Sequence, residues 1–478
     1  MNRLLLLLQI TLLLVAKATL VCAKGYTWQT IPLKKAYIYR LYLNDKQHSP
    51  YSIDHPEKYL SERAIGRRKR QGIAIDSTDL PVSPTYINSI KSKGLTIMGT
   101  SRWHNTITVA STTDNVAQTI EGLPYVKSCL RLYKSPDSLV VYPREKVGKL
   151  TCIDSTSTSE YGDGFNQINL LNGTGLHASG FKGKGMLIAI IDAGFRNVDK
   201  ISSLKTNIKA TADFSPRRTN SIFTEHYHGT MVLSVMAANK RNVLIGTAPE
   251  ADYALIRSED IETETRAEED SWTMATEFAD SIGADLINSS LGYTHWDGDS
   301  IGPRLRDLNG QTAYISQTAA MLASKGIVLC NSAGNEGNSS WHKINVPADA
   351  DNILTVGAVD FNKKSTAFSS LGPTQDGRVK PDVCGPGKNV YVVDGSGTMT
   401  TNSGTSFASP IICGMTACLW QALPELTAKQ IISLVRQSAD RHQWPDNVYG
   451  YGVPDYTEAL SIGKKMVSAT GEWDALSR

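Results

Sequence analysis

Four reactive side chains stand directly after apolar runs or at the start of apolar helical stretches. They are Asp192 after the run 187–191, His228 before the stretch 231–238, Asn335 after the run 327–330, and Ser406 before the stretch 411–420. A serine hydroxyl attacks an amide carbonyl efficiently only when a base removes its proton, and an imidazole with a pKa near ~6.5 suits that task. An aspartate can hold the imidazole in one tautomer and stabilise its charged form. These residue types therefore indicate acyl transfer through a serine nucleophile.

Each of the four residues also has a structural interpretation when it is taken alone. Asp192 could cap the end of a strand, and Asn335, next to Gly334, could form a turn. His228 and Ser406 could lie at the starts of helices with no role beyond capping. Since these interpretations would have to hold at all four positions together, the catalytic interpretation is favoured.

The local motifs around these residues resemble those of the subtilisin-like serine proteases, the subtilase family or peptidase S8. The chain order Asp, His, Ser and the motifs at 192–194, 228–230, 332–337 and 404–410 carry the resemblance, which spans about residues 160–460. It implies a triad of Asp192, His228 and Ser406, and an oxyanion hole made by the Asn335 side-chain amide and the Ser406 backbone N–H. Many subtilases carry Thr or Ser after the aspartate, whereas Ala193 offers no hydroxyl there.

The same resemblance implies a substrate cleft in which the peptide lies as an added β-strand. One wall of the S1 pocket pairs with the substrate backbone, a second wall faces it, and a polar but uncharged floor closes the pocket. The residues implied are Ser290, Leu291 and Gly292 for the first wall, Ala333 and Gly334 for the second, and Asn345 for the floor.

The opposite substrate strand is expected between Ile256 and Ser271, and this stretch is strongly acidic. Two interpretations stay open: a solvated acidic loop, or a rim that favours basic residues upstream of the scissile bond. Only Arg257 and Arg266 oppose the acidic residues, which are Glu259, Asp260, Glu262, Glu264, Glu268, Glu269 and Asp270.

The elements that position these residues follow from the hydrophobic pattern after residue 185. Short, continuously apolar runs occur at 186–191, 254–256, 286–288, 327–330 and 353–356, and helices are expected over 271–282 and 313–324. Apolar strands that alternate with helices indicate a parallel sheet covered on both faces, so we expect a three-layer α/β domain with a mostly parallel sheet. Reactive groups in such a domain gather at the carboxyl ends of the strands.

Residues 24–135 form a smaller unit. The segments 36–43 and 106–110 are β-rich and 56–71 is a charged helical stretch, so we expect an α+β domain. It resembles the propeptide of certain exported bacterial subtilases, which assists folding and blocks the cleft until it is removed. The run 67–70, Arg-Arg-Lys-Arg, could be a processing site or a nucleic-acid patch, but within a helical stretch we interpret it as a solvated basic face.

The expected organisation is a signal peptide (1–23), the propeptide-like domain (24–135), a linker that contains the processing site (136–165), the catalytic domain (166–462) and a C-terminal tail (463–478). Arg3 precedes the apolar run 4–15, which is too short to cross a ~30 Å hydrocarbon core. Small or compact residues at 21–23 suit signal cleavage, whereas Val21 disfavours a lipoprotein acylated at Cys22. We therefore expect an exported protein, periplasmic or extracellular, without a transmembrane segment.

The two parts of the chain have opposite charge. Residues 1–150 carry 22 Lys+Arg against 10 Asp+Glu, and residues 151–478 carry 27 against 36. This split argues against a nucleic-acid binder with one basic surface, and it predicts an attraction between the two parts that weakens as salt is raised.

The cysteines do not indicate a cofactor. If Cys129 leaves with the propeptide, five cysteines remain beyond Cys22, so at least one thiol is free or joined to another chain. Cys330 and Cys413 lie in apolar sequence and are expected to be buried. The spacings do not match a zinc site, no metal or other cofactor is predicted, and calcium is possible by family resemblance only.

The sequence thus predicts an exported, autoprocessed serine endopeptidase that acts on protein or peptide substrates through an acyl-enzyme at Ser406. Its own propeptide would be an intramolecular inhibitor. Two alternatives stay open: a catalytically silent subtilase scaffold that binds peptides or a partner, and a maturase dedicated to one partner protein.

Overall fold

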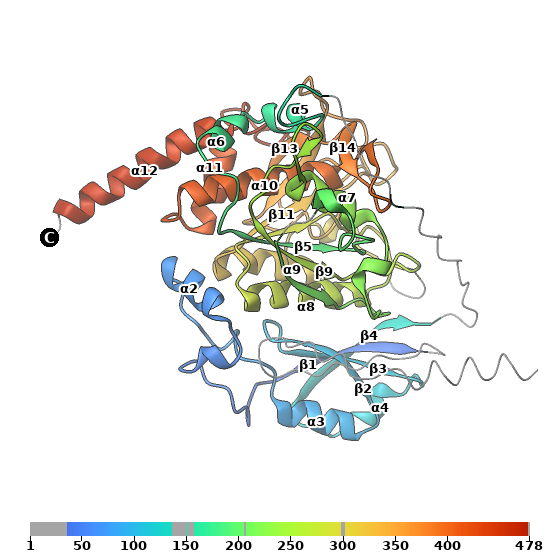
Figure 1. Cartoon of the computed structure of the whole chain (residues 1–478). Coiled ribbons are helices and arrows are strands. Elements are labelled where there is room, and N and C mark those ends of the chain that lie inside the picture. Colours follow the sequence, from blue (N-terminus) through green and yellow to red (C-terminus); the bar gives the residue numbers. More distant parts are fainter. Residues whose placement is uncertain (1–35, 136–149, 151–156, 205–206, 298–301, 477–478) are drawn as a thin grey trace, which may run out of the picture.

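The computed structural model describes residues 36–135, 150, 157–204, 207–297 and 302–476, which form an N-terminal unit and a larger α/β unit (Figure 1). The N-terminal unit has a four-stranded antiparallel sheet of order β2-β3-β1-β4. One face of this sheet packs on α3, which confirms the α+β expectation. Its elements are β1 Tyr37–Leu43, a 3₁₀ turn Pro56–Lys58, α2 Glu62–Arg70, α3 Pro84–Ser92, β2 Thr96–Ser101, β3 Thr106–Ser111, α4 Val116–Thr119 and β4 Val126–Lys134.

The larger unit is built on a seven-stranded parallel sheet of order β13-β12-β11-β10-β5-β9-β6. The apolar runs seen in the sequence are its buried strands, which confirms the predicted parallel sheet. The strand order reverses at β5, so the carboxyl ends of β9, β5, β10 and β11 lie side by side. The strands are β5 Leu187–Asp192, β6 Asn207–Asp213, β9 Asp252–Arg257, β10 Leu286–Ser289, β11 Val328–Ser332, β12 Leu354–Val359 and β13 Val383–Pro386.

Helices cover both faces of the central sheet and complete a three-layer arrangement (Figure 1). On one face lie α8 Ala267–Ile282 and α9 Tyr314–Met321, and on the other lie α7 His228–Ala237 and α10 Thr405–Ala422. A hairpin of β14 Val390–Val393 and β15 Met399–Asn402 leads into α10. The outer elements are α5 Phe165–Asn169, α6 Thr174–Ala178, a second hairpin of β7 Asn239–Lys240 and β8 Leu244–Ile245, α11 Ala428–Gln437 and α12 Tyr456–Leu476.

Two expected boundaries differ from the observed elements. The end of the expected linker packs on the catalytic unit, where the Tyr161 carbonyl accepts from the N–H of Ile245 (3.2 Å) and the N–H of Asp163 donates to Val243 (3.1 Å). The expected tail begins inside α12, which continues to Leu476. The signal peptide and most of the linker, with Cys22 and Cys152, lie outside the described residues.

The N-terminal sheet packs against α8 and α9, so that these two helices lie between the two sheets (Figure 1). The run 67–70 lies at the edge of this interface. Arg67 and Arg68 are buried and form ion pairs with Asp280 of α8, Arg68 at 2.9 Å. The predicted solvated basic face is therefore wrong for these two arginines, because docking turns that face of α2 toward α8. Lys69 and Arg70 are exposed, as predicted.

The acidic stretch is also largely covered. Glu268, Glu269 and Asp270 form the first turn of α8, where acidic side chains favour the helix dipole. Arg40 of β1 donates to both carboxylate oxygens of Asp270 at 3.0 Å, and it lies 3.6 Å from Glu269. The interpretation as a solvated loop is therefore wrong for the buried members, which are Glu259, Asp260, Glu268, Glu269 and Asp270.

Two further expectations concern the apolar segments and the cysteines. Among the described residues, no helix combines the length and the apolar character that a membrane span needs. Cys330 and Cys413 are buried free thiols, which confirms the packing role expected for them.

Candidate active site

Asp192 and His228 meet where the carboxyl end of β5 faces the first turn of α7. The two carboxylate oxygens of Asp192 lie 2.9 Å and 3.1 Å from His228 Nδ1. Asp192 is fully buried, and its Oδ1 also accepts from the N–H of Ala193 at 2.7 Å. Gly229 lets the start of α7 lie close to the segment after β5, because a Cβ at residue 229 would lie only 2.5 Å from the Gly194 carbonyl oxygen. The sequence predicted this pair, and the structure brings it together.

The environment of His228 makes it a stronger base than a free imidazole. Burial lowers the pKa of His228, but the charge of Asp192 and its hydrogen bond raise it more, so the pKa lies above its ordinary value. The Asp192 contacts occupy Nδ1 and leave Nε2 as the free ring nitrogen. Nε2 is thus the atom that can take a proton from another group.

Ser406 is the second residue of α10, which packs against α7. The imidazole of His228 contacts the ring of Phe407, the next residue, with a centroid distance of 6.0 Å. Ser406 Oγ donates to the carbonyl of Ser290 at 3.4 Å and forms no hydrogen bond with His228. Such contacts often tighten only when substrate binds. The N–H of Ser406 is one of the four at a helix start that have no intrahelical acceptor.

Asn335 is exposed in the turn after β11, beside the start of α10. Its Oδ1 accepts from both the N–H (2.9 Å) and the hydroxyl (3.0 Å) of Thr405. Because the amide oxygen is held in this way, Nδ2 is the part of the side chain left to donate. Thr405 was missed by the sequence analysis, although its place between Gly404 and Ser406 in the motif was a signal for it.

The residues expected to bind substrate also gather near this edge of the sheet. A Cβ on Gly292 would lie 2.7 Å from Asn345 Nδ2, and a Cβ on Gly334 would lie 2.5 Å from Asn345 Oδ1. The Asn345 amide therefore lies between the two glycine backbones. This placement is consistent with an S1 pocket that has Asn345 as its floor and the two glycines in its walls. Ser290 Oγ donates to the Ser406 carbonyl at 2.8 Å, and Leu291 is half-buried.

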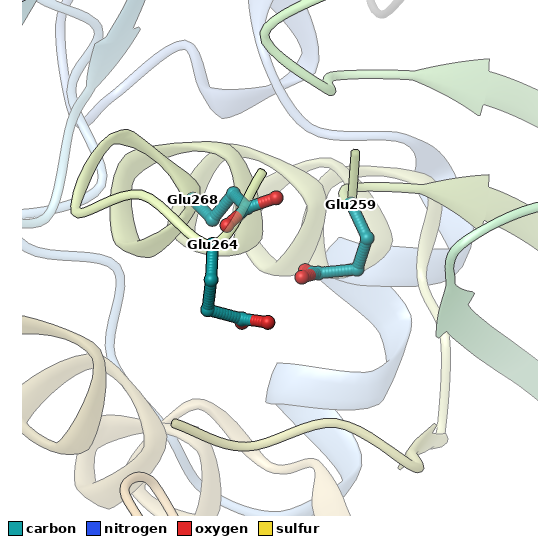
Figure 2. A group of neighbouring side chains, drawn as sticks. All are labelled: Glu259, Glu264 and Glu268. Carbon is teal, nitrogen blue, oxygen red and sulfur yellow. The ribbon is translucent and has the colours of Figure 1, made fainter. Parts of the chain in front are cut away.

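Three glutamates of the acidic stretch converge beyond the end of β9 (Figure 2). Carboxylate oxygens of Glu259, Glu264 and Glu268 lie within 4.8 Å of one another. Burial and the neighbouring acidic charges raise the pKa of Glu264 to about 8 and the pKa of Glu268 well above its usual range. Burial raises the pKa of Glu259 to about 7, although hydroxyls of Tyr293 and Ser258 donate to it.

This cluster does not fit a calcium site well. The two oxygens of Glu268 each accept one N–H bond, from Asp260 (2.9 Å) and Thr265 (2.8 Å), and three carboxylates supply fewer oxygens than the roughly six to eight that calcium takes. We assign no metal to it. The rim interpretation stays a prediction for the half-buried Glu262 and Glu264.

Comparison with known proteins agrees with this geometry. Residues 183–452 match the model of the subtilase family of S8 peptidases, which is more than half of the chain. The chain belongs to the subtilase family. Residues 38–145 match the S8 peptidase propeptide domain of Bacteroidota. The protein is thus a serine endopeptidase made as a zymogen, with an N-terminal propeptide as its intramolecular inhibitor.

Relatives support the same family, and a solved structure supports the fold. Subtilisin DY from Bacillus licheniformis is 31% identical over 275 residues, which cover 57% of this chain and 90% of that protein. Subtilisin NAT from Bacillus subtilis subsp. natto is 30% identical over 275 residues, which cover 57% of this chain and 65% of that protein. The crystal structure of MycP1 from Mycobacterium smegmatis shares the fold, with a TM-score of 0.52 and 21% identity over 66% of this chain and 89% of that one.

Proposed function

We propose that this subtilase is an exported endopeptidase that cleaves peptide bonds through a triad of Asp192, His228 and Ser406. The observation that carries the proposal is the double contact of the buried Asp192 carboxylate with His228 Nδ1, beside the start of α10 where Ser406 lies. This arrangement supplies a base and a nucleophile at one edge of the sheet.

In the proposed reaction, Ser406 Oγ forms a bond to the substrate carbonyl carbon while His228 Nε2 takes the hydroxyl proton. His228 then gives this proton to the leaving amine as the C–N bond breaks, which leaves an acyl-enzyme. Water attacks this ester by the same steps, releases the acid and restores Ser406. Asp192 stabilises the transient imidazolium.

The negative charge that develops on the carbonyl oxygen needs donors that are already in place. We propose the Asn335 Nδ2 group and the Ser406 N–H for this role. The bonds from Thr405 to Asn335 Oδ1 support it, because they turn the amide so that Nδ2 is the donor left for substrate.

For substrate binding, we propose that the peptide pairs with Ser290, Leu291 and Gly292. The P1 side chain would then lie between Gly292 and the Ala333-Gly334 segment, above Asn345. The closeness of both glycines to the Asn345 amide, where neither leaves room for a Cβ, supports this assignment. We further propose that residues 1–23 direct export, that the enzyme cuts its own chain within 136–165, and that it works in the periplasm or outside the cell.

A fluorophosphonate probe, which reacts with an activated serine, tests the proposal on protein whose propeptide has been cut off in every variant by tagged wild-type enzyme that is then removed. We expect labelling of the wild type, complete loss in Ser406→Ala, and full retention in Ser403→Ala, a matched exposed serine three residues earlier. Absence of labelling in the wild type would favour the silent scaffold.

Processing and substrate range need separate measurements. Intact mass and N-terminal sequencing of the wild type should show a cut within 136–165 that Ser406→Ala lacks. Two identical unprocessed chains would contradict autoprocessing. Digestion of casein, an unstructured protein, is expected for a general endopeptidase, whereas a dedicated maturase would leave it intact.

A further inference from the structure

Arg257 is a buried arginine at the carboxyl edge of the sheet, in register with the triad aspartate. It ends β9, where it pairs with Asp192 of β5 on one side and with Asp213 of β6 on the other. Only 4% of Arg257 is exposed. Two strand-end aspartates thus flank Arg257 in the sheet. The guanidinium forms an ion pair with Asp213 (3.0 Å), while Asp192 bonds to His228.

The guanidinium joins three segments that surround the triad aspartate. Its Nε donates to the carbonyl of Ala193 at 3.1 Å, directly after Asp192. Its Nη1 donates to Ser215 Oγ (2.6 Å) and to the Arg217 carbonyl (2.9 Å) in the loop after β6. Its Nη2 lies 3.9 Å from a carboxylate oxygen of Glu225, three residues before His228.

Ala193 is consequently held from both sides. Its N–H donates to Asp192 Oδ1 at 2.7 Å, and its carbonyl accepts from Arg257. The residue after Arg257, Ser258, donates its N–H to the Asp192 carbonyl at 3.1 Å. The Ala193 side chain has no hydroxyl to orient the carboxylate, so the backbone N–H is the only group that Ala193 offers to the Asp192 side chain.

Carboxylates around Arg257 balance its charge, so the buried guanidinium holds the Ala193 carbonyl without being an unpaired charge. Asp213 neutralises it, and Glu225 and Glu259 are the other carboxylates that face it. The pair of Arg257 and Asp213 is therefore close to neutral as seen from His228.

We propose that Arg257 is a positioning residue that aligns the Asp192 carboxylate with His228 through the backbone of Ala193, whose carbonyl it holds. This proposal rests on the proposed triad. It distinguishes Arg257 from an arginine that only stabilises the fold, because the loss of the Ala193 contact should reduce kcat even in a folded chain.

The test compares Arg257→Gln and Arg257→Lys with the wild type. Arg436→Gln is the matched control, since Arg436 pairs with Asp382 at 2.7 Å but lies on α11. Asp213 retains donors from Ser215 and Thr219 in the variants, which supports folding without the guanidinium. Slowly processing variants are matured by tagged wild-type enzyme that is then removed, with Ser406→Ala treated in the same way as the blank.

For Arg257→Gln we expect kcat to fall by about 10- to 100-fold with KM little changed, as for a reacting group displaced by about 1 Å. The acid limb of the pH profile should move to lower pH, because a misaligned Asp192 supports the imidazolium less. Arg257→Lys should recover thermal stability through Asp213 but not kcat, since one ammonium cannot reproduce the fork of contacts. Arg436→Gln should lose stability at most, with wild-type kcat and pH profile.

Two results would overturn the proposal. One is a kcat and pH profile for Arg257→Gln within twofold of the wild type. The other, decisive if Arg257→Gln does not fold, is full recovery of kcat in Arg257→Lys. Both are distinct from failure of the proposed function, in which the wild type itself would neither react with the fluorophosphonate probe nor cleave peptides.

Discussion

Three arginines of the propeptide form ion pairs with the carboxylate of Asp280. The Asp280→Asn variant tests how much these ion pairs contribute to the binding of the propeptide by the catalytic unit. Arg67, Arg68 and Arg102 all form ion pairs with this one side chain, which is fully buried. Burial raises the pKa of Asp280, but the charges of the three arginines outweigh it and hold the pKa below its usual range. The substitution keeps the shape of the side chain, removes its charge and replaces one of its two acceptor oxygens by an NH2 donor.

The size of the effect follows from the burial of these partners. Arg67 and Arg68 are almost completely buried, so in the variant they would keep their positive charges without the carboxylate. Removing one partner of a buried ion pair costs about 3–5 kcal/mol. Since each 1.4 kcal/mol is tenfold in affinity, the propeptide should inhibit the Asp280→Asn enzyme between about 100-fold and about 4,000-fold less tightly.

The assay is inhibition of the processed enzyme by a polypeptide of residues 24–135, with one propeptide preparation for all variants. Asp351→Asn is the control, because Asp351 is exposed and contacts its neighbour Asn352. If the Asp280→Asn enzyme does not mature, urea unfolding of the full chain replaces the inhibition assay. The free energy of unfolding of Ser406→Ala is then compared with that of the double variant Ser406→Ala/Asp280→Asn. An inhibition constant within threefold of the wild type would refute the reasoning.

The structure also sharpens the expected effect of salt on the zymogen. Salt screens exposed charges strongly and buried pairs little. Partly exposed pairs such as Arg63 with Asp285 should weaken as salt is raised, whereas those of Asp280 should persist. We therefore expect added salt to raise the inhibition constant of the wild type, but by a smaller factor than the Asp280→Asn substitution does.

Three further predictions concern the catalytic edge of the sheet. Since Asp192 raises the pKa of His228, and the neutral imidazole is the base, the acid limb of kcat/KM should have its midpoint above pH ~6.5. The same shift stabilises the fold below that pH, and this contribution is lost as pH rises through the raised pKa. Asp192→Asn should lower the midpoint and reduce kcat by about 10⁴-fold, and an unchanged pH profile would contradict the assignment. Asn335→Ala should lower kcat by about 10²- to 10³-fold with KM nearly constant in steady-state peptide hydrolysis, whereas a loss below tenfold would exclude it as the main oxyanion donor. Neutralising Glu262 and Glu264 together should remove a preference for basic residues upstream of the cut in a peptide library assayed above the pKa of Glu264, which is about 8, and a retained preference would end the rim hypothesis.

Several features were predictable because they depend on short segments of sequence. Asp192, His228, Asn335 and Ser406 each stand in a local motif at a strand end or a helix start, and apolar strands that alternate with helices have few other solutions than a covered parallel sheet. Arg257 was missed although it directly follows the apolar run at 254–256. It was counted only as an opposing charge in the acidic stretch, since its partners Ala193 and Asp213 are distant in sequence.

The sequence by itself determined the fold class, the family and the residues able to do the chemistry, because periodicity and motifs are local properties. Only the tertiary structure decided where the charges lie. The basic run at Arg67 and the acidic turn at Asp270 both appear solvated in sequence, yet each is buried against a partner in the other unit. Whether a charged side chain faces water or an opposite charge depends on the docking of surfaces more than 200 residues apart, which no local pattern encodes.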